Sequence, residues 1–398
     1  MRGFLAGAIA ATVLTVAACG DGRRDDGGPS SPTDPFGLAV TLAPCGGSTA
    51  LFTTLPIAQA DIGGWVPLGA MNPSGHTFPT DHQYIYLTFF GSAPRPLVPL
   101  YAPGNITVLG ARSSTYSGTS GFTDYSIYFS SCRETFAEFG HVRSITPSLL
   151  AKLPPFDQGC NTYSPAPGSS VTACWTKGVE VVVPAGEVIG TAAGLDLWLF
   201  DSRVPPIVYA NPARWGGASA GFDHFHVVPF SDYYAEPLRS TVQSMLGSYD
   251  GKMKRTIPPL GGTIATDVPG TAQGTWFFGT APTYPESPHL AIAPNNVDPR
   301  RIEISMGTSG GAYPSGLRAM LPSETGPFNR HPAQITPGPT VHCWDLINAG
   351  DFGAGHGIAL LQLVDATTLR VEGKFGASVT CAAQQPPALT AAAVTFRR

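Results

Sequence analysis

A chain of 398 residues is long enough for two domains that each bury a core, yet only 13% of its residues are charged, while 47 are glycine and 39 are proline. Its 23 Lys and Arg residues against 27 Asp and Glu give a net charge of -4, and no basic cluster is visible, which excludes a surface built to bind nucleic acid. Such frequent Gly and Pro favour many short strands over long helices.

The N-terminal residues have the features of a targeting segment. Arg2 supplies a positive charge, residues 4–16 are apolar, and Cys19 follows Val16-Ala17-Ala18 in a pattern that resembles the bacterial lipobox. We therefore expect residues 1–18 to be a lipoprotein signal peptide and a lipid on Cys19 to hold the protein on a membrane of the bacterial cell envelope, facing the periplasm or the exterior. A plain secretory signal that is cut elsewhere is the alternative.

Two globular domains are expected after the leader. Residues 19–38 consist largely of Asp, Arg, Gly, Ser and Pro without an apolar period, which is typical of a flexible tether. A basic run at residues 252–255 followed by Pro258-Pro259 marks a boundary. The prediction is a first domain at residues 39–255 and a smaller second domain at residues 256–398.

Short strands dominate both domains, so the predicted fold class is mainly β. Residues 83–87 alternate as a half-buried strand does, and short turns between strands favour antiparallel sheet. A helical turn is expected at residues 148–153 and a short helix at residues 237–246. Other strands of the first domain are expected within residues 99–108, 124–129, 136–141, 179–190 and 195–201. The second domain is expected to be an all-β barrel or sandwich with strands at residues 275–279, 289–293, 302–306, 340–344, 358–364 and 369–373.

Six cysteines follow Cys19, an even number that suggests disulfides in an exported chain. Fifteen pairings are possible for six cysteines. Closeness in sequence favours Cys160 with Cys174, and a shared domain favours Cys343 with Cys381. A zinc site built from cysteines is disfavoured, because no two of them are spaced as zinc-binding pairs are.

Metal-ligand side chains precede the strand at residues 83–87. His76, Asp81 and His82 lie at its mouth, where binding and catalytic groups are often placed. A later segment, Asp223-His224-Phe225-His226-Val227, would place His224 and His226 on one face of a strand, so that both imidazoles could reach one ion. The alternative is that Asp81 caps a turn and that the histidines make ordinary hydrogen bonds.

Four segments arrive in an order that resembles the lysostaphin-type (LytM-like) zinc peptidases of the duplicated-hybrid-motif fold. They are the His/Asp segment at residues 76–87, the turn Tyr101-Ala102-Pro103, Gly140-His141-Val142, and the turn at residues 183–190. The resemblance spans residues 65–234. It implies a duplicated-hybrid-motif-like antiparallel domain, a zinc cofactor, and a peptide of peptidoglycan or another envelope peptide as the partner.

The chain departs from that family at two points. The family's metal lies between the His and Asp of H-x3-D and the second His of a later H-x-H, whereas His76 and Asp81 stand as H-x4-D. Where the family has its H-x-H strand, this chain has Leu195-Asp196-Leu197-Trp198, and its own H-x-H comes some thirty residues later. The inserted residue could be absorbed at Pro79, or Asp81 could face away.

The resemblance then assigns a role to each residue. His76, Asp81 and His226 would hold zinc, with His82 as a substitute ligand. His224 would take the proton of the attacking water, and His141 would steady the oxyanion. Asp196 and Asp201 are candidates to fix imidazole tautomers from the second layer, although an aspartate at a strand end often forms a turn instead.

Two functional hypotheses follow. One is a zinc-dependent hydrolase of peptidoglycan or another peptide with an altered site. The other is a lipid-anchored binding or scaffolding protein that keeps the peptidase fold without its chemistry.

Replacing Cys19 by Ser should release the protein from the membrane or leave it unprocessed, because the lipid would be attached at that residue. Separation of membrane and soluble fractions of the host, with mass analysis of the N-terminus, measures this. Unchanged acylation and membrane retention in the variant would contradict the lipobox interpretation.

Overall fold

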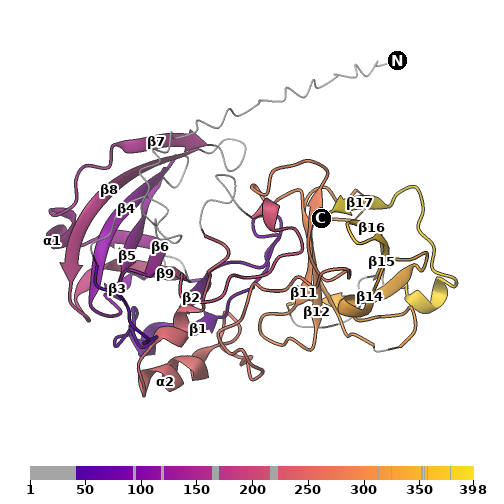
Figure 1. Cartoon of the computed structure of the whole chain (residues 1–398), viewed down its shortest axis with the longest axis horizontal. Coiled ribbons are helices and arrows are strands. Elements are labelled where there is room, and N and C mark those ends of the chain that lie inside the picture. The colour runs from indigo at the N-terminus through magenta and orange to yellow at the C-terminus, as the bar shows by residue number, and fades with distance from the viewer. Residues whose placement is uncertain are drawn as a thin grey trace, which may run out of the picture.

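A computed structural model describes residues 42–92, 96–117, 121–163, 170–215, 223–311, 313–323, 325–350, 353, 355, 357–376 and 378–398. Within these residues the strands form a nine-stranded sheet followed by a closed eight-stranded barrel (Figure 1). The predicted mainly β fold with two parts is confirmed, and of the barrel or sandwich expected for the second part the structure has the barrel. Cys19, the leader and the whole of the expected tether lie outside the described residues. In the described part, no helix is long and apolar enough to cross a membrane.

The sheet is antiparallel throughout and has the order β1-β2-β9-β6-β5-β4-β8-β7, with β3 also paired to β9. Strand β9 therefore lies between β2 and β6, and it joins the two segments that carry His82 and His141. The strands are β1 Ile62–Val66, β2 Gln83–Leu87, β3 Val98–Tyr101, β4 Ile106–Tyr116, β5 Phe122–Ser130, β6 Thr135–Ile145, β7 Gln158–Tyr163, β8 Val171–Val183 and β9 Val188–Asp201.

Alternation along these strands separates a core face from a cleft face. Ile85 and Leu87 of β2 are buried in the main apolar core, while Tyr84 and Tyr86 point to the opposite face. The predicted helix is present as α2, Leu238–Met245, which buries Val242, and the helical turn as α1, Pro147–Leu150. Short 3-10 turns occupy Gln59–Asp61, Pro212–Arg214 and Phe230–Tyr233.

The barrel closes on itself, so its strands leave no open edge. Its interior is filled by large apolar side chains such as Trp276, Trp344 and Leu361. The strands are β10 Gly274–Phe278, β11 Leu290–Pro294, β12 Ile302–Met306, β13 Gly316–Met320, β14 His342–Asn348, β15 Gly357–Asp365, β16 Thr368–Phe375 and β17 Val394–Arg397, with 3-10 turns at Pro332–Gln334 and Cys381–Ala383.

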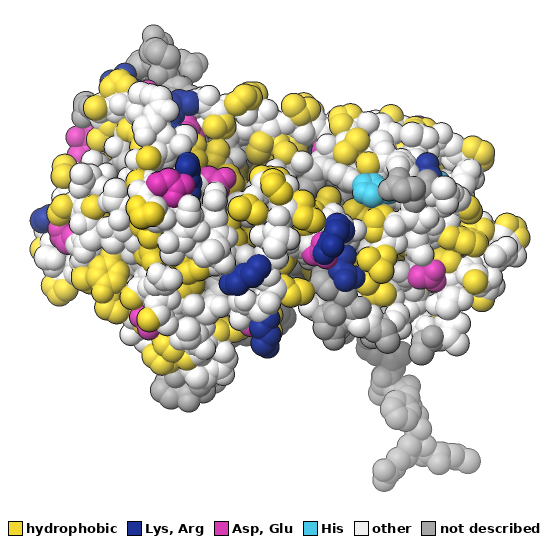
Figure 2. All heavy atoms as spheres, turned by 90° about the horizontal axis from the view of Figure 1, so that it is seen from below, with side chains coloured by type: hydrophobic (Ala, Val, Ile, Leu, Met, Phe, Trp, Pro, Cys, Tyr) yellow, Lys and Arg dark blue, Asp and Glu magenta, His cyan; other side chains and the backbone are white. Residues whose placement is uncertain are grey.

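Sheet and barrel are packed against each other through a shared apolar cluster. Phe78 and Trp215 come from the first part and Phe277 from the barrel, and their rings lie 5.3–6.1 Å apart. Asn296 of the barrel donates a hydrogen bond of 3.0 Å to the carbonyl of Pro67. On the face drawn in Figure 2, charged side chains are few and stand in small groups, as the low charge content requires.

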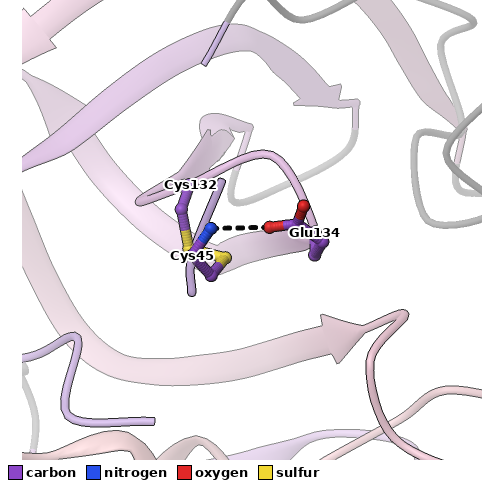
Figure 3. A group of neighbouring side chains, drawn as sticks. All are labelled: Cys45, Cys132 and Glu134. Atoms are coloured by element: carbon purple, nitrogen blue, oxygen red, sulfur yellow. Dashed lines mark hydrogen bonds between the residues drawn. A yellow bond between two sulfur atoms is a disulfide. The ribbon is translucent and has the colours of Figure 1, made fainter. Parts of the chain in front are cut away.

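All six cysteines of the globular parts form disulfides: Cys45–Cys132, Cys160–Cys174 and Cys343–Cys381. The two pairs favoured from the sequence are confirmed. The remaining disulfide, Cys45–Cys132, ties the start of the described chain to the connection between β5 and β6. Beside it, the carboxylate of Glu134 accepts a hydrogen bond of 2.7 Å from the backbone N–H of Cys45 (Figure 3).

The disulfides should differ in their effect on stability. Because Cys45–Cys132 closes 87 residues and Cys160–Cys174 only 14, chain entropy predicts losses of about 4.5 and about 3 kcal/mol when each pair is replaced by Ala. Urea unfolding of the two double variants measures this, with alkylation of the unreduced parent protein as the check that it has no free thiols. Equal losses would contradict the loop-length argument.

Candidate functional site

A cleft of about 1370 Å³ lies between the sheet and the barrel. On the sheet side its lining includes His76, Asp124, His141 and Asp196, and on the barrel side Glu303. Asp124, His141 and Asp196 belong to the cleft face of the sheet, because the core face of the same strands is filled with apolar residues. Titratable groups in a concave, partly apolar site are the usual starting point for a functional hypothesis.

His82 is a deeply buried imidazole, with 3% of its surface exposed. Its Nδ1–H donates a hydrogen bond of 2.9 Å to Asp81 Oδ1, which leaves Nε2 as the second ring nitrogen. That Nε2 has no hydrogen-bond partner and lies 3.7 Å from Asp196 Oδ2. A buried ring nitrogen left without a partner is uncommon, because it loses its contact with water and gains nothing in return.

Asp81 is held by three partners. Besides His82, the indole N–H of Trp198 donates to its Oδ1 at 2.9 Å, and Nδ1 of His224 lies 3.4 Å from its Oδ2. Burial opposes ionisation, but the hydrogen bond from His82, the charge of His224 and the indole hydrogen bond together hold the pKa of Asp81 well below its usual range. Asp81 is therefore a carboxylate at neutral pH.

His141 occupies a bulge in β6 and has a φ of 60°, which non-glycine residues seldom adopt. This conformation turns the ring toward the cleft, where 59% of the side chain is exposed. Nδ1 donates to Asp124 Oδ2 at 2.7 Å, and Nε2 lies 3.4 Å from Asp196 Oδ2. The hydrogen bond to Asp124, against the effect of burial and helped by Asp196, raises the pKa of His141 to about 9.

One oxygen, Oδ2 of Asp196, is thus the meeting point of two imidazoles. His82 and His141 each have Nδ1 on an aspartate and Nε2 directed at that oxygen. A third ring, His76, lies 5.4 Å from His82 between ring centres, and burial together with His82 lowers the pKa of His76. His76 is therefore neutral at physiological pH and offers a lone pair.

Gly140, beside His141, is required by close packing. A Cβ added there would lie 2.8 Å from a ring carbon of Trp198 and 3.3 Å from Cβ of Asp196. The ring of Trp198 packs at a tilt against His82 with 4.0 Å between ring centres, so its position fixes that imidazole as well as Asp81. The glycine therefore allows the indole to cover the cluster from the β6 side.

The expected strand at residues 223–227 is wrong: residues 224–226 form a turn. Asp223 accepts a hydrogen bond from the backbone N–H of Phe225 at 3.0 Å and one from Nδ1 of His226 at 2.7 Å. The imidazole of His226 is therefore bonded to Asp223 within the same turn. His224 points to the cluster, but both of its ring nitrogens lie beside other groups, Asp81 Oδ2 at 3.4 Å and the Tyr284 hydroxyl at 3.1 Å.

The donor atoms of the expected ligands His76, Asp81 and His226 do not all lie within 4.8 Å of one another. In the described part of the chain, the one group of three ligand-type side chains whose donor atoms all lie within 4.8 Å of one another is Cys45, Cys132 and Glu134, and its sulfurs form a disulfide (Figure 3). Asp201 does not support an imidazole either, because it pairs with Arg203 at 2.6 Å and accepts from the Tyr233 hydroxyl at 2.5 Å.

Glu286 and Tyr284 of the barrel, which no sequence pattern singled out, complete the site. Glu286 accepts a hydrogen bond of 2.8 Å from the backbone N–H of Phe78, which lies in the loop between His76 and Asp81. The ring of Phe78 stacks on His289 with 5.2 Å between centres. Tyr284 contacts His224. The loop that carries the ligand-type residues is therefore docked on the barrel.

Glu286 should make stability depend on pH. Burial raises the pKa of Glu286 to about 8. The contribution of Glu286 to the free energy of unfolding is therefore full below the ordinary pKa of about 4.3 and is lost as the pH rises through about 8. Glu286→Gln, which keeps an acceptor oxygen but cannot ionise, should therefore lose less stability than the parent between pH 5 and pH 8.5. Urea unfolding at the two pH values measures this, with the exposed Glu236→Gln as the matched control. Equal losses in parent and Glu286→Gln would contradict it.

Comparison of the chain with protein-family models, with curated proteins and with solved structures gave no match.

Proposed function

We propose that the protein is a metal-dependent hydrolase of the bacterial cell envelope, with His76, His82 and Asp196 as the ligands of a zinc ion. The observation that carries the proposal is the buried, unpartnered Nε2 of His82 directed at Asp196. Two imidazoles and one carboxylate are a donor set that catalytic zinc takes in proteins, with a further position left for water or substrate.

The surroundings of His82 support this assignment. An imidazole that binds a metal commonly donates its other N–H to a carboxylate, which fixes the tautomer and raises the basicity of the ligand. Asp81 occupies that place for His82, and Trp198 in turn holds Asp81. This proposal changes two roles expected from the sequence. Asp81 supports the ligand His82 instead of binding the ion, and Asp196 binds the ion instead of supporting an imidazole.

The chain's own residues would then divide the chemistry. A bound zinc ion would polarise the scissile carbonyl and lower the pKa of a bound water toward neutrality. His141, an imidazolium at neutral pH, presents its charge to the cleft next to Asp196, where it would steady a developing oxyanion. Asp124 orients that ring by accepting from Nδ1–H. His224, 3% exposed and bonded on both sides, would help to hold Asp81 and would not act as a base.

The substrate and the location are inferred from the sequence. The resemblance to lysostaphin-type peptidases favours a peptide of peptidoglycan, and the cleft has room for an extended chain. Three disulfides favour an oxidising compartment outside the cytoplasm, and the leader with Cys19 favours a lipid anchor there.

A binding module without catalysis is the second candidate. It is favoured by the spacing of the donor atoms, because His76, His82 and Asp196 are not among the described groups whose donors all lie within 4.8 Å. Ion binding would have to draw the rings inward. In this alternative the same cleft would hold an envelope ligand, and the Asp–His pairs would serve only to fix the sheet.

Metal analysis of variants separates the candidates. Protein purified without chelators should hold about one zinc, which should be lost as the pH falls through the histidine range near ~6.5. His82→Ala should remove the metal and the hydrolysis of cross-linked peptidoglycan, because it deletes the buried donor. His226→Ala should keep both, because that ring is held by Asp223. His331→Ala, in the barrel, is the control.

Two outcomes count against the proposal. Metal content near zero with no gain on adding zinc would leave the binding module. Retention of zinc in His82→Ala with its loss in His226→Ala would restore the ligand set expected from the sequence.

A further inference from the structure

Part of the cleft lining consists of aromatic side chains that contact one another and yet remain open to solvent. Ring centres of Tyr86 and Phe90 are 4.7 Å apart, and those of Tyr86 and Tyr249 are 5.8 Å apart. Phe90 is 45% exposed and Tyr249 55% exposed. Exposed aromatic surface gathered in a cleft is costly in water, and such surface marks binding sites.

This aromatic cluster, formed by Tyr86, Phe90 and Tyr249, is continuous with the candidate site. Tyr84 lies 6.1 Å from Tyr86 and 4.6 Å from His82 between ring centres. Because Tyr84 and Tyr86 share one face of β2, they form a strip that leads along the cleft wall from the histidines to the exposed rings. A ligand seated on the cluster would therefore lie next to the candidate site.

Polar groups suited to hydroxyls border the aromatic cluster. The carboxylate of Asp250 is 2.8 Å from the ammonium group of Lys252 and accepts a hydrogen bond of 2.7 Å from the Ser248 hydroxyl. All three residues line the same cleft. The charges of Asp250 and Lys252 cancel, so the border formed by Ser248, Asp250 and Lys252 is neutral. It therefore favours a neutral ligand that offers both hydrogen-bond donors and acceptors.

The backbone nearby is closed to a peptide that would add as a strand. β1 is the edge strand next to β2, but its outer side is already bridged at Trp65 to Leu246, and Gly247 donates a hydrogen bond of 2.8 Å to the Trp65 carbonyl. A Cβ on Gly64 would lie 2.4 Å from the Ser248 carbonyl oxygen. The segment that carries Tyr249 thus covers this edge.

We propose that the aromatic cluster is a saccharide subsite, on which a neutral pyranose ring stacks while its hydroxyls bond to the rim formed by Ser248, Asp250 and Lys252. A pyranose has an apolar C–H face for an aromatic ring and a polar edge for such groups, which matches the cluster and its rim. The subsite needs no metal, so its test does not depend on whether the protein is a hydrolase. It adds that the cleft receives a molecule that carries a sugar.

Calorimetric titration of the mature full-length protein tests this. The probe is a tetrasaccharide of β-1,4-linked N-acetylglucosamine, measured with and without EDTA. Phe90→Ala and Tyr249→Ala should each weaken binding about tenfold, the loss expected for one stacked ring. Tyr163→Ala removes a tyrosine of similar exposure, 51%, on β7 outside the cleft lining, and should leave binding unchanged.

The readings with chelator separate the two proposals. Equal binding with and without EDTA supports a subsite independent of the metal, whatever the metal content proves to be. Absence of binding to the tetrasaccharide at millimolar concentration overturns the proposal. So does binding that Phe90→Ala and Tyr249→Ala leave at the parent value.

Discussion

The carboxylate of Asp81 connects the parts of this molecule that are distant in sequence. It is bonded to His82 at the mouth of β2, to the indole of Trp198 on β9, and it lies beside His224 on the turn that follows the sheet. A buried carboxylate is costly unless its partners are in place, so the three elements must meet correctly for the charge to be tolerated. Through His224 the same connection reaches Tyr284 of the barrel.

The barrel is thereby part of the site. Phe78 packs in one apolar cluster with Phe277 of the barrel, and Glu286 accepts a hydrogen bond from its backbone N–H. The loop between His76 and Asp81 is therefore held by contacts with the barrel. A loop anchored in this way keeps few alternative conformations, which suits ligands that must be ready before an ion or a substrate arrives. A β domain that looks separable in sequence is thus a structural partner of the first.

Local pattern was sufficient for most of the fold. Alternation of side chains predicted β2, β5 and the second half of β9, and Pro and Gly placed the turns between strands. β1 was missed because Gly63-Gly64 breaks its alternation, and β7 because every residue of that edge strand is exposed and so carries no apolar period. The barrel strand β13 was missed for a related reason, since Gly316 and Arg318 interrupt its apolar residues.

The site was predictable in its residue types but not in its pairings. His82, His141 and Asp196 were all recognised, yet their convergence depends on β9 lying between β2 and β6, which no local pattern states. The segment at His224 and His226 alternates like a strand, but Asp223 accepts from the backbone two residues on and turns the chain instead. Asp124, Tyr284 and Glu286 had no signal beyond their acidity or aromaticity.

If the protein is held at its N-terminus, the Cys45–Cys132 disulfide changes the path along which a pulling force passes through the chain. A pulling force that enters ahead of Cys45 crosses the sulfur bridge to Cys132 and continues toward the C-terminus, because the covalent bond is the shorter load-bearing path. The 86 residues enclosed by the bridge, as the sequence separation of 87 implies, are left out of that path. They include His76, Asp81, His82 and Asp124, so tension on an anchored chain would bypass the strands that shape this half of the cleft.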